Sequence, residues 1–155
     1  MNITVHREAD PRLKRELQEQ LTRLLPEWFG KAESNAHYAA QAEVLDGYVA
    51  EADGVRRGLL LLGNHSPRSA EVHWMGVDPA LHRSGIGKAL IDAAAIGAKA
   101  SGVKWLFVAT LHPRVAYEPY QRTRKFYEAQ GFEYVLEEQF PADPGNPIGW
   151  FLRAL

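Results

Sequence analysis

One stretch of sequence says most about this chain: Met75-Gly76-Val77-Asp78-Pro79-Ala80-Leu81-His82-Arg83-Ser84-Gly85-Ile86-Gly87-Lys88-Ala89-Leu90. It joins a predicted strand to a predicted helix through a turn that holds Gly85 and Gly87. The start of a helix leaves backbone N–H groups without partners and carries about half a positive charge. Because glycines let a ligand approach that backbone closely, the turn predicts a site for a diphosphate.

Two common phosphate motifs do not fit this turn. A Rossmann turn needs glycine or alanine three residues after its second glycine, and this chain has Leu90 there. A P-loop needs Ser or Thr after Gly-Lys, and here Ala89 follows Lys88. The failed Rossmann pattern disfavours a nucleotide-binding oxidoreductase.

Two segments together resemble the GNAT superfamily of N-acetyltransferases. Gly85 and Gly87 match its motif A, [QR]-x-x-G-x-[GA], although His82 stands at the Gln/Arg position. Residues 123–132 include Phe-Tyr-Glu-Ala-Gln-Gly-Phe and resemble motif B, a helix that ends in F-Y-E-x-x-G-F. The resemblance covers roughly residues 68 to 135, and it implies acetyl-CoA as co-substrate.

The resemblance also implies where acetyl-CoA binds. Motif A would hold the pyrophosphate, and the pantetheine arm would pair like an extra strand between two splayed strands, 69–77 and 104–111. Tyr120 and Thr123 stand where the family often has Asn and Ala, which puts the pantetheine contact of motif B in doubt. The expected cofactor-binding residues are Met75, Gly76, Val77, His82, Arg83, Ser84, Gly85, Ile86, Gly87, Lys88, Tyr120, Thr123 and Tyr127.

The order of predicted elements favours a single α/β domain over residues 1–155, with a mixed, twisted sheet flanked by helices. Asp53-Gly54 predicts a tight hairpin turn, and Asp10-Pro11 predicts the start of a helix with a leucine stripe. The predicted strands cover residues 3–5, 47–51, 57–62, 69–77, 104–111, 132–140 and 148–155, and the predicted helices cover 11–26, 36–43, 85–101 and 119–130.

Composition limits the partners. The chain has 155 residues, 46% hydrophobic and 24% charged, with 18 basic and 19 acidic side chains, which is ordinary for a globular protein. A net charge of -1 disfavours a nucleic-acid partner, and no apolar run is long enough for a membrane span. The absence of cysteine and of a signal-peptide pattern favours the cytoplasm. No histidine spacing predicts a metal site, and a homodimer is left open.

Acetyl transfer needs a neutral amine, and deprotonating a lysine-like amine at pH 7 costs about 4.6 kcal/mol. Glu71 lies fourteen residues before Gly85 on the strand that leads into the turn, where the histone-acetylating branch has its base. His73 is the second candidate base, and water is the third. Strand alternation predicts Glu71, His73 and Met75 on one face, and Val72 and Trp74 on the other.

Tyr127 is the candidate general acid by its place in motif B, with core packing as the alternative interpretation. A backbone N–H near Met75 to Val77 would polarise the thioester carbonyl. Trp28 and Phe29 either wall the acceptor pocket or pack on the sheet, and residues 141–147 are a second candidate specificity segment. The sequence predicts direct acetyl transfer to a primary amine of a small molecule or peptide. The rival prediction is a non-catalytic CoA or acyl-CoA sensor or assembly module.

Overall fold

A seven-stranded sheet runs through the computed structural model, which describes residues 1–155. The strand order is β1-β2-β3-β4-β5-β7-β6. The strands are β1 (Ile3–Glu8), β2 (Asp46–Ala52), β3 (Val55–Ser66), β4 (Ser69–Val77), β5 (Trp105–Leu111), β6 (Glu133–Glu138) and β7 (Ile148–Ala154). The helices are α1 (Pro11–Leu24), α2 (Ala32–Val44), α3 (Ile86–Ala100) and α4 (Glu118–Ala129), with a short 3-10 turn at Pro79–Leu81.

Local sequence signals explain the first elements. The Asp10 carboxylate accepts a hydrogen bond from the Arg12 backbone N–H at 2.9 Å, so the predicted cap of α1 is confirmed. Asp53 and Gly54 have φ values of 51° and 80°, the left-handed conformation that a two-residue hairpin turn requires. The predicted second helix is longer than expected, because α2 begins at Ala32 rather than at residue 36.

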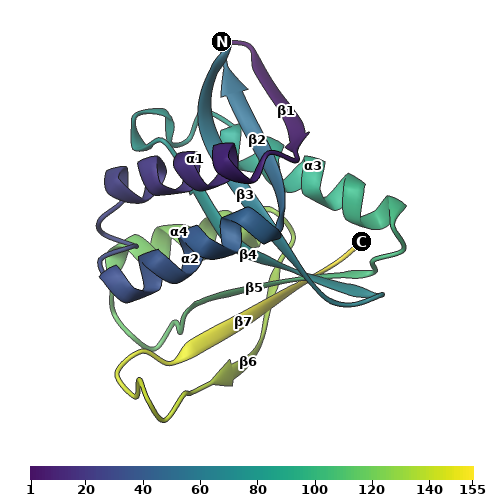
Figure 1. Ribbon diagram of the computed structural model, residues 1–155. Coiled ribbons are helices and arrows are strands. Elements are labelled where there is room, and N and C mark those ends of the chain that lie inside the picture. Colours follow the sequence, from purple (N-terminus) through teal and green to yellow (C-terminus); the bar gives the residue numbers. More distant parts are fainter.

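Helices cover both faces of the sheet, as Figure 1 shows. On one face α3 and α4 pack against the sheet in the larger core cluster, which includes Leu90, Ile91 and Tyr127. On the other face Leu17 and Leu21 of α1 form a smaller cluster with the sheet. The mixed sheet with helices on its faces confirms the expected fold class.

The two central strands splay apart, as expected. β4 and β5 are parallel and pair only between residues 69–71 and residues 105–107. Beyond Glu71, β4 stays paired with β3, and β5 stays paired along its whole length with β7. The sheet therefore contains a wedge, which opens toward the carboxyl ends of both strands (Figure 1). None of the helices combines the length and the apolar character that a membrane crossing would need.

Candidate active site

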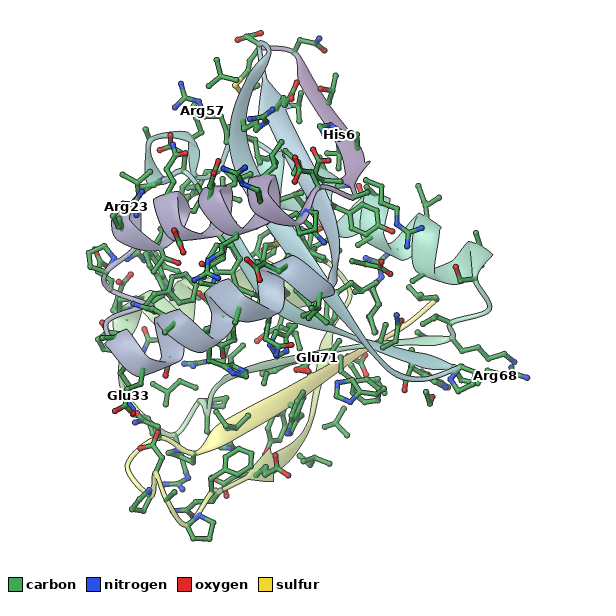
Figure 2. The ribbon with its side chains drawn as sticks, viewed as in Figure 1. His6, Arg23, Glu33, Arg57, Arg68 and Glu71 are labelled. Atoms are coloured by element: carbon green, nitrogen blue, oxygen red, sulfur yellow. The ribbon has the colours of Figure 1, made fainter.

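The wedge between β4 and β5 is the floor of a pocket of about 730 Å³. Figure 2 labels Glu71, the last residue of β4 that pairs with β5, in the middle of the sheet. The α1–α2 loop, α2, the start of α3 and the whole length of α4 complete the walls. The pocket thus brings together elements from four separate parts of the sequence.

The start of α3 presents free backbone donors to this pocket. Gly85 adopts φ 94° at the N-cap and offers no side-chain cap, and the first hydrogen bond runs from the Ala89 N–H to the Gly85 carbonyl. The N–H groups of residues 86–88 consequently have no acceptor in the protein. Arg83 also has a left-handed backbone, with φ 66°, an unfavourable conformation that tightens the turn. This geometry fits an anionic group placed at the helix start.

Gly87 has a packing role that the sequence did not reveal. A Cβ atom added there would lie 3.0 Å from the Phe126 ring of α4. Because real Cβ atoms rarely approach so closely, glycine lets α3 and α4 come together at this point. A bulky residue at Gly87 would therefore disturb the α3–α4 contact as well as the turn.

The edge of β4 that faces the wedge carries backbone groups that pair with no neighbouring strand. The His82 Nε2–H donates to the Val77 carbonyl at 2.9 Å, so the Val77 backbone points away from β3. Alternation along the strand directs the Met75 backbone the same way. These groups face the gap that β5 leaves, where an extended ligand could pair with them.

A β-bulge in β4 corrects the predicted faces of this strand. Leu61 pairs with Trp74 and Leu62 pairs with Val72, so His73 is an extra residue without a partner on β3. Val72 packs in the larger core cluster, whereas Trp74 packs in the smaller cluster on the opposite face. Val72 and Trp74 therefore do not share a face, and the expectation that Met75 lies beside Glu71 and His73 is wrong. Met75 packs against the larger cluster.

The two candidate bases occupy different positions. His73 lines the pocket, and its Nε2 atom is buried without a hydrogen-bond partner. Glu71 does not line the pocket; its Oε1 lies 3.7 Å from His73 Nδ1 and 2.9 Å from His65 Nε2. Burial raises the pKa of Glu71, but hydrogen bonds and charge from His73 and His65 outweigh burial, and the net pKa is lowered. Glu71 is therefore a carboxylate behind His73 rather than a pocket wall.

Tyr127 is buried on α4, with 5% of its surface exposed, and its ring meets Phe126 and Phe132 edge to face. Burial, with a contribution from Tyr120, raises the pKa of Tyr127 strongly. Burial also raises the pKa of Tyr120 to about 12. Both tyrosines line the pocket, and both phenols are neutral at physiological pH. The predicted acid is thus both a core aromatic and a pocket residue.

Phe29 combines the two alternatives that the sequence left open, whereas Trp28 lines the pocket and is held by α4. Both line the pocket, and Phe29 also stacks on Trp74 with ring centroids 5.2 Å apart. The Trp28 indole N–H donates to the Thr123 hydroxyl at 2.9 Å. Thr123 donates in turn to the Pro119 carbonyl, so its hydroxyl anchors Trp28 to α4.

The remaining predicted residues lie around the start of α3. His82 and Arg83 are exposed and line the pocket, and the Ser84 hydroxyl donates to the Leu81 carbonyl. Lys88 also lines the pocket, but it forms an ion pair with Asp92 one turn further along α3. The Ile86 side chain is buried in the core, so only its backbone can contact a ligand.

Sequence reasoning missed several pocket or neighbouring residues, among them Tyr38, Trp74, His65 and Lys125. The Tyr38 ring lies 5.4 Å from the His73 ring, although the two residues are 35 positions apart. Nothing in the weakly amphipathic sequence of α2 indicated that Tyr38 faces a pocket. The bulge at His73 decided the position of Trp74, and no single-strand pattern reveals a bulge.

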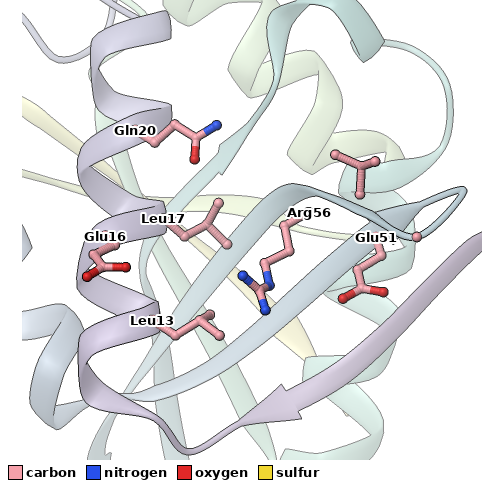
Figure 3. A pocket seen from close by; sticks show the side chains of 8 residues that line it. Leu13, Glu16, Leu17, Gln20, Glu51 and Arg56 are labelled. Atoms are coloured by element: carbon pink, nitrogen blue, oxygen red, sulfur yellow. The ribbon is translucent and has the colours of Figure 1, made fainter.

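A second pocket, of about 450 Å³, lies between α1 and the β2–β3 hairpin. Figure 3 shows Leu13 and Leu17 of α1 on one side of it and Glu51 and Arg56 of the hairpin on the other. It is separate from the glycine turn and from every predicted site residue.

The comparison with protein families decides between the possible relatives of this fold. The family described as "Acetyltransferase (GNAT) domain" matches residues 44–134, more than half of the chain. The chain belongs to the GNAT family. The matched residues of this GNAT domain include β4, the turn, α3, β5 and α4, the elements that form most of the pocket. A search of curated proteins gives no significant match.

Solved structures share the fold of this GNAT domain. A GNAT-family protein from Desulfovibrio desulfuricans aligns over 99% of both chains with a TM-score of 0.83 and 18% identity. A GNAT acetyltransferase from Elizabethkingia anophelis with acetyl-CoA bound aligns over 99% of both chains, with a TM-score of 0.73 and 18% identity. An aminoglycoside 6'-acetyltransferase type Ii aligns over 99% of this chain and 97% of its own, with a TM-score of 0.72 and 18% identity. At these identities the likeness establishes the fold.

Proposed function

We propose that this protein is an N-acetyltransferase that moves the acetyl group of acetyl-CoA directly to a primary amine of a small molecule or peptide. The observation that carries the proposal is the wedge between β4 and β5, which opens beside the unpaired N–H groups of α3. Family membership supports the reaction class, and a relative holding acetyl-CoA supports the co-substrate.

The residues of the pocket fit the parts of acetyl-CoA. The pyrophosphate takes the free N–H groups at the start of α3. Arg83 and Lys125 line the pocket without any ion pair in the protein, so their charges are available to phosphates. The pantetheine amides pair with the free edge of β4 at Met75 and Val77, and the same edge supplies an N–H to the thioester carbonyl.

The acceptor amine attacks the thioester carbon in its neutral form. Its nitrogen bonds to the thioester carbon, the C–S bond breaks, and the amine proton goes to His73 Nε2. His73 is assigned this role because the residue lines the pocket and its buried Nε2 atom has no hydrogen-bond partner. Glu71 Oε1 lies 3.7 Å from the other ring nitrogen, Nδ1, and its lowered pKa makes Glu71 a poor base at neutral pH.

Tyr127 returns a proton to the departing CoA thiolate. A phenol with a raised pKa donates to a thiolate only if the thiolate is also strongly basic. The same burial that raises the pKa of Tyr127 leaves the thiolate poorly solvated, which raises its proton affinity. Direct transfer needs no covalent enzyme intermediate, in keeping with a chain that has no cysteine.

Thiol release from acetyl-CoA with a panel of primary amines tests the proposal. We expect amine-dependent release, with kcat/KM rising with pH. His73→Gln should lower kcat/KM about 100-fold or more at pH 7 and recover as the amine deprotonates unaided, and Glu71→Gln should do less. A larger effect of Glu71→Gln would make Glu71 the base. Acetyl-CoA binding without thiol release would favour a CoA-binding sensor instead.

A further inference from the structure

One part of the pocket is built almost entirely from aromatic rings. It lies on the α1–α2 side of β4 and is called here the aromatic chamber, formed by Phe29, Tyr38, His73, Trp74 and Tyr120. Phe29 stacks on Trp74 at 5.2 Å, and Tyr38 meets His73 edge to face at 5.4 Å. The chamber includes His73, the residue assigned to receive the amine proton, so the acceptor must reach it.

The lining of the whole pocket carries lysine and arginine but no carboxylate. It has no aspartate and no glutamate, but it has four basic residues: Arg83, Lys88, Arg122 and Lys125. Arg122 is paired with Glu27 and Glu118, which do not line the pocket. The nearest carboxylate behind the chamber is Glu71, which contacts His65 and His73. A second positive charge on an acceptor would therefore find no free carboxylate here.

We infer that the acceptor is a monoamine with an aromatic or apolar body, and not a polycation such as a polyamine or an aminoglycoside. This inference rests on the proposed function and names its substrate class. The body of such an amine would pack between the rings of Phe29, Tyr38 and Trp74, with its amino group at His73. A polyamine or aminoglycoside would bring extra positive charges into a pocket whose lining offers no carboxylate to pair with them. The fold shared with an aminoglycoside acetyltransferase does not extend to that substrate class.

Thiol release with saturating acetyl-CoA at pH 8 compares three amines: 2-phenylethylamine, spermidine and kanamycin. We expect kcat/KM for 2-phenylethylamine to exceed each of the other two by about ten-fold or more. Phe29→Ala should lower kcat/KM for 2-phenylethylamine about ten-fold, the scale expected for one buried ring. The matched control is Phe140→Ala, which removes an exposed ring outside the pocket and should change nothing.

A substitution that gains activity distinguishes an effect on substrate recognition from a loss of folding. Tyr38→Glu places a carboxylate in the chamber and should shift preference toward spermidine by about ten-fold. Faster reaction with spermidine or kanamycin than with 2-phenylethylamine in the wild type would overturn the inference and leave amine acetylation standing. If none of the amines caused thiol release, the proposed function would be overturned. In that case, tryptophan fluorescence in the presence of CoA would test the chamber by titration with 2-phenylethylamine. If the fluorescence showed no saturable change, the inference would be overturned as well.

Discussion

Single residues of the candidate site also have structural roles. Tyr127 is a core ring and faces the pocket, and the Thr123 hydroxyl fixes Trp28. His73 owes its position to one extra residue in β4. The candidate chemistry therefore depends on side chains that the core already holds still, which limits the reorganisation needed during reaction.

Tyr127→Phe should lower kcat by about ten-fold or more and leave acetyl-CoA affinity nearly unchanged. In the proposed mechanism the removed hydroxyl acts as the thiolate departs, so its contribution belongs to the transition state. Steady-state kinetics and calorimetric titration with acetyl-CoA measure the two effects. Tyr134→Phe, at an exposed tyrosine outside the pocket, is the control. An unchanged kcat in Tyr127→Phe, with chemistry rate-limiting, would leave Tyr127 a core aromatic only.

Glu71 should make the folded state sensitive to acid. Its pKa is lowered from 4.5 in the folded protein, so its contribution is fully present above pH 4.5 and is lost as pH falls through the folded pKa. Wild type should therefore lose stability more steeply than Glu71→Gln below about pH 4.5. Melting temperatures of both proteins between pH 3 and pH 7 measure this, and parallel curves would contradict it.

At the scale of elements, close contacts between helix and sheet explain glycines that look unfavourable in the sequence. Gly97 lies within α3, where alanine would be about 1 kcal/mol better by intrinsic propensity. A Cβ atom added at Gly97 would overlap the hydroxyl of Tyr48, a buried residue of β2. The glycine thus lets α3 lie close to the sheet.

Gly97→Ala should consequently destabilise the protein by about 1–3 kcal/mol despite the better helix propensity. Tyr48→Phe removes the overlapping hydroxyl, so the same glycine change should cost less in a Tyr48→Phe background. Urea unfolding of the four proteins completes this double-mutant cycle. If Gly97→Ala stabilised the wild-type protein, the Tyr48 side chain would have to move aside at little cost in free energy.

At the scale of the whole molecule, acetyl-CoA bound as proposed would connect both halves of the sheet across the wedge. Ligand at one hundred times its dissociation constant should add about 2.7 kcal/mol to the free energy of unfolding. For a protein of this size, the melting temperature should rise by about 5 to 10 °C. Thermal scans with acetyl-CoA measure the shift, and NADH should give none.

Lys125→Glu should shrink that shift at the same acetyl-CoA concentration, because it reverses a charge that lines the pocket without an ion pair. Lys99→Glu, on the exposed last turn of α3 and outside the pocket, is the matched control. If the melting-temperature shift shrank equally in both variants, net charge rather than a local phosphate contact would govern acetyl-CoA binding.

The sequence alone determined the elements whose cause is local. The Asp10 cap, the Asp53-Gly54 turn, the helix that follows Gly85 and the strand before it were all predicted, because each depends on residues within a few positions. The motifs also led to the GNAT family, and hence to the splay of β4 and β5, which the structure confirms.

Only the tertiary structure decided the bulge at His73, the place of Glu71 behind it, and the aromatic chamber. The bulge arises from the register between β3 and β4, which no single strand encodes. The chamber joins Phe29, Tyr38, Trp74 and Tyr120 from four elements, and each looked in the sequence like an ordinary core or surface aromatic. Contacts between distant segments are set by packing of the whole sheet with its helices, so local patterns cannot specify them.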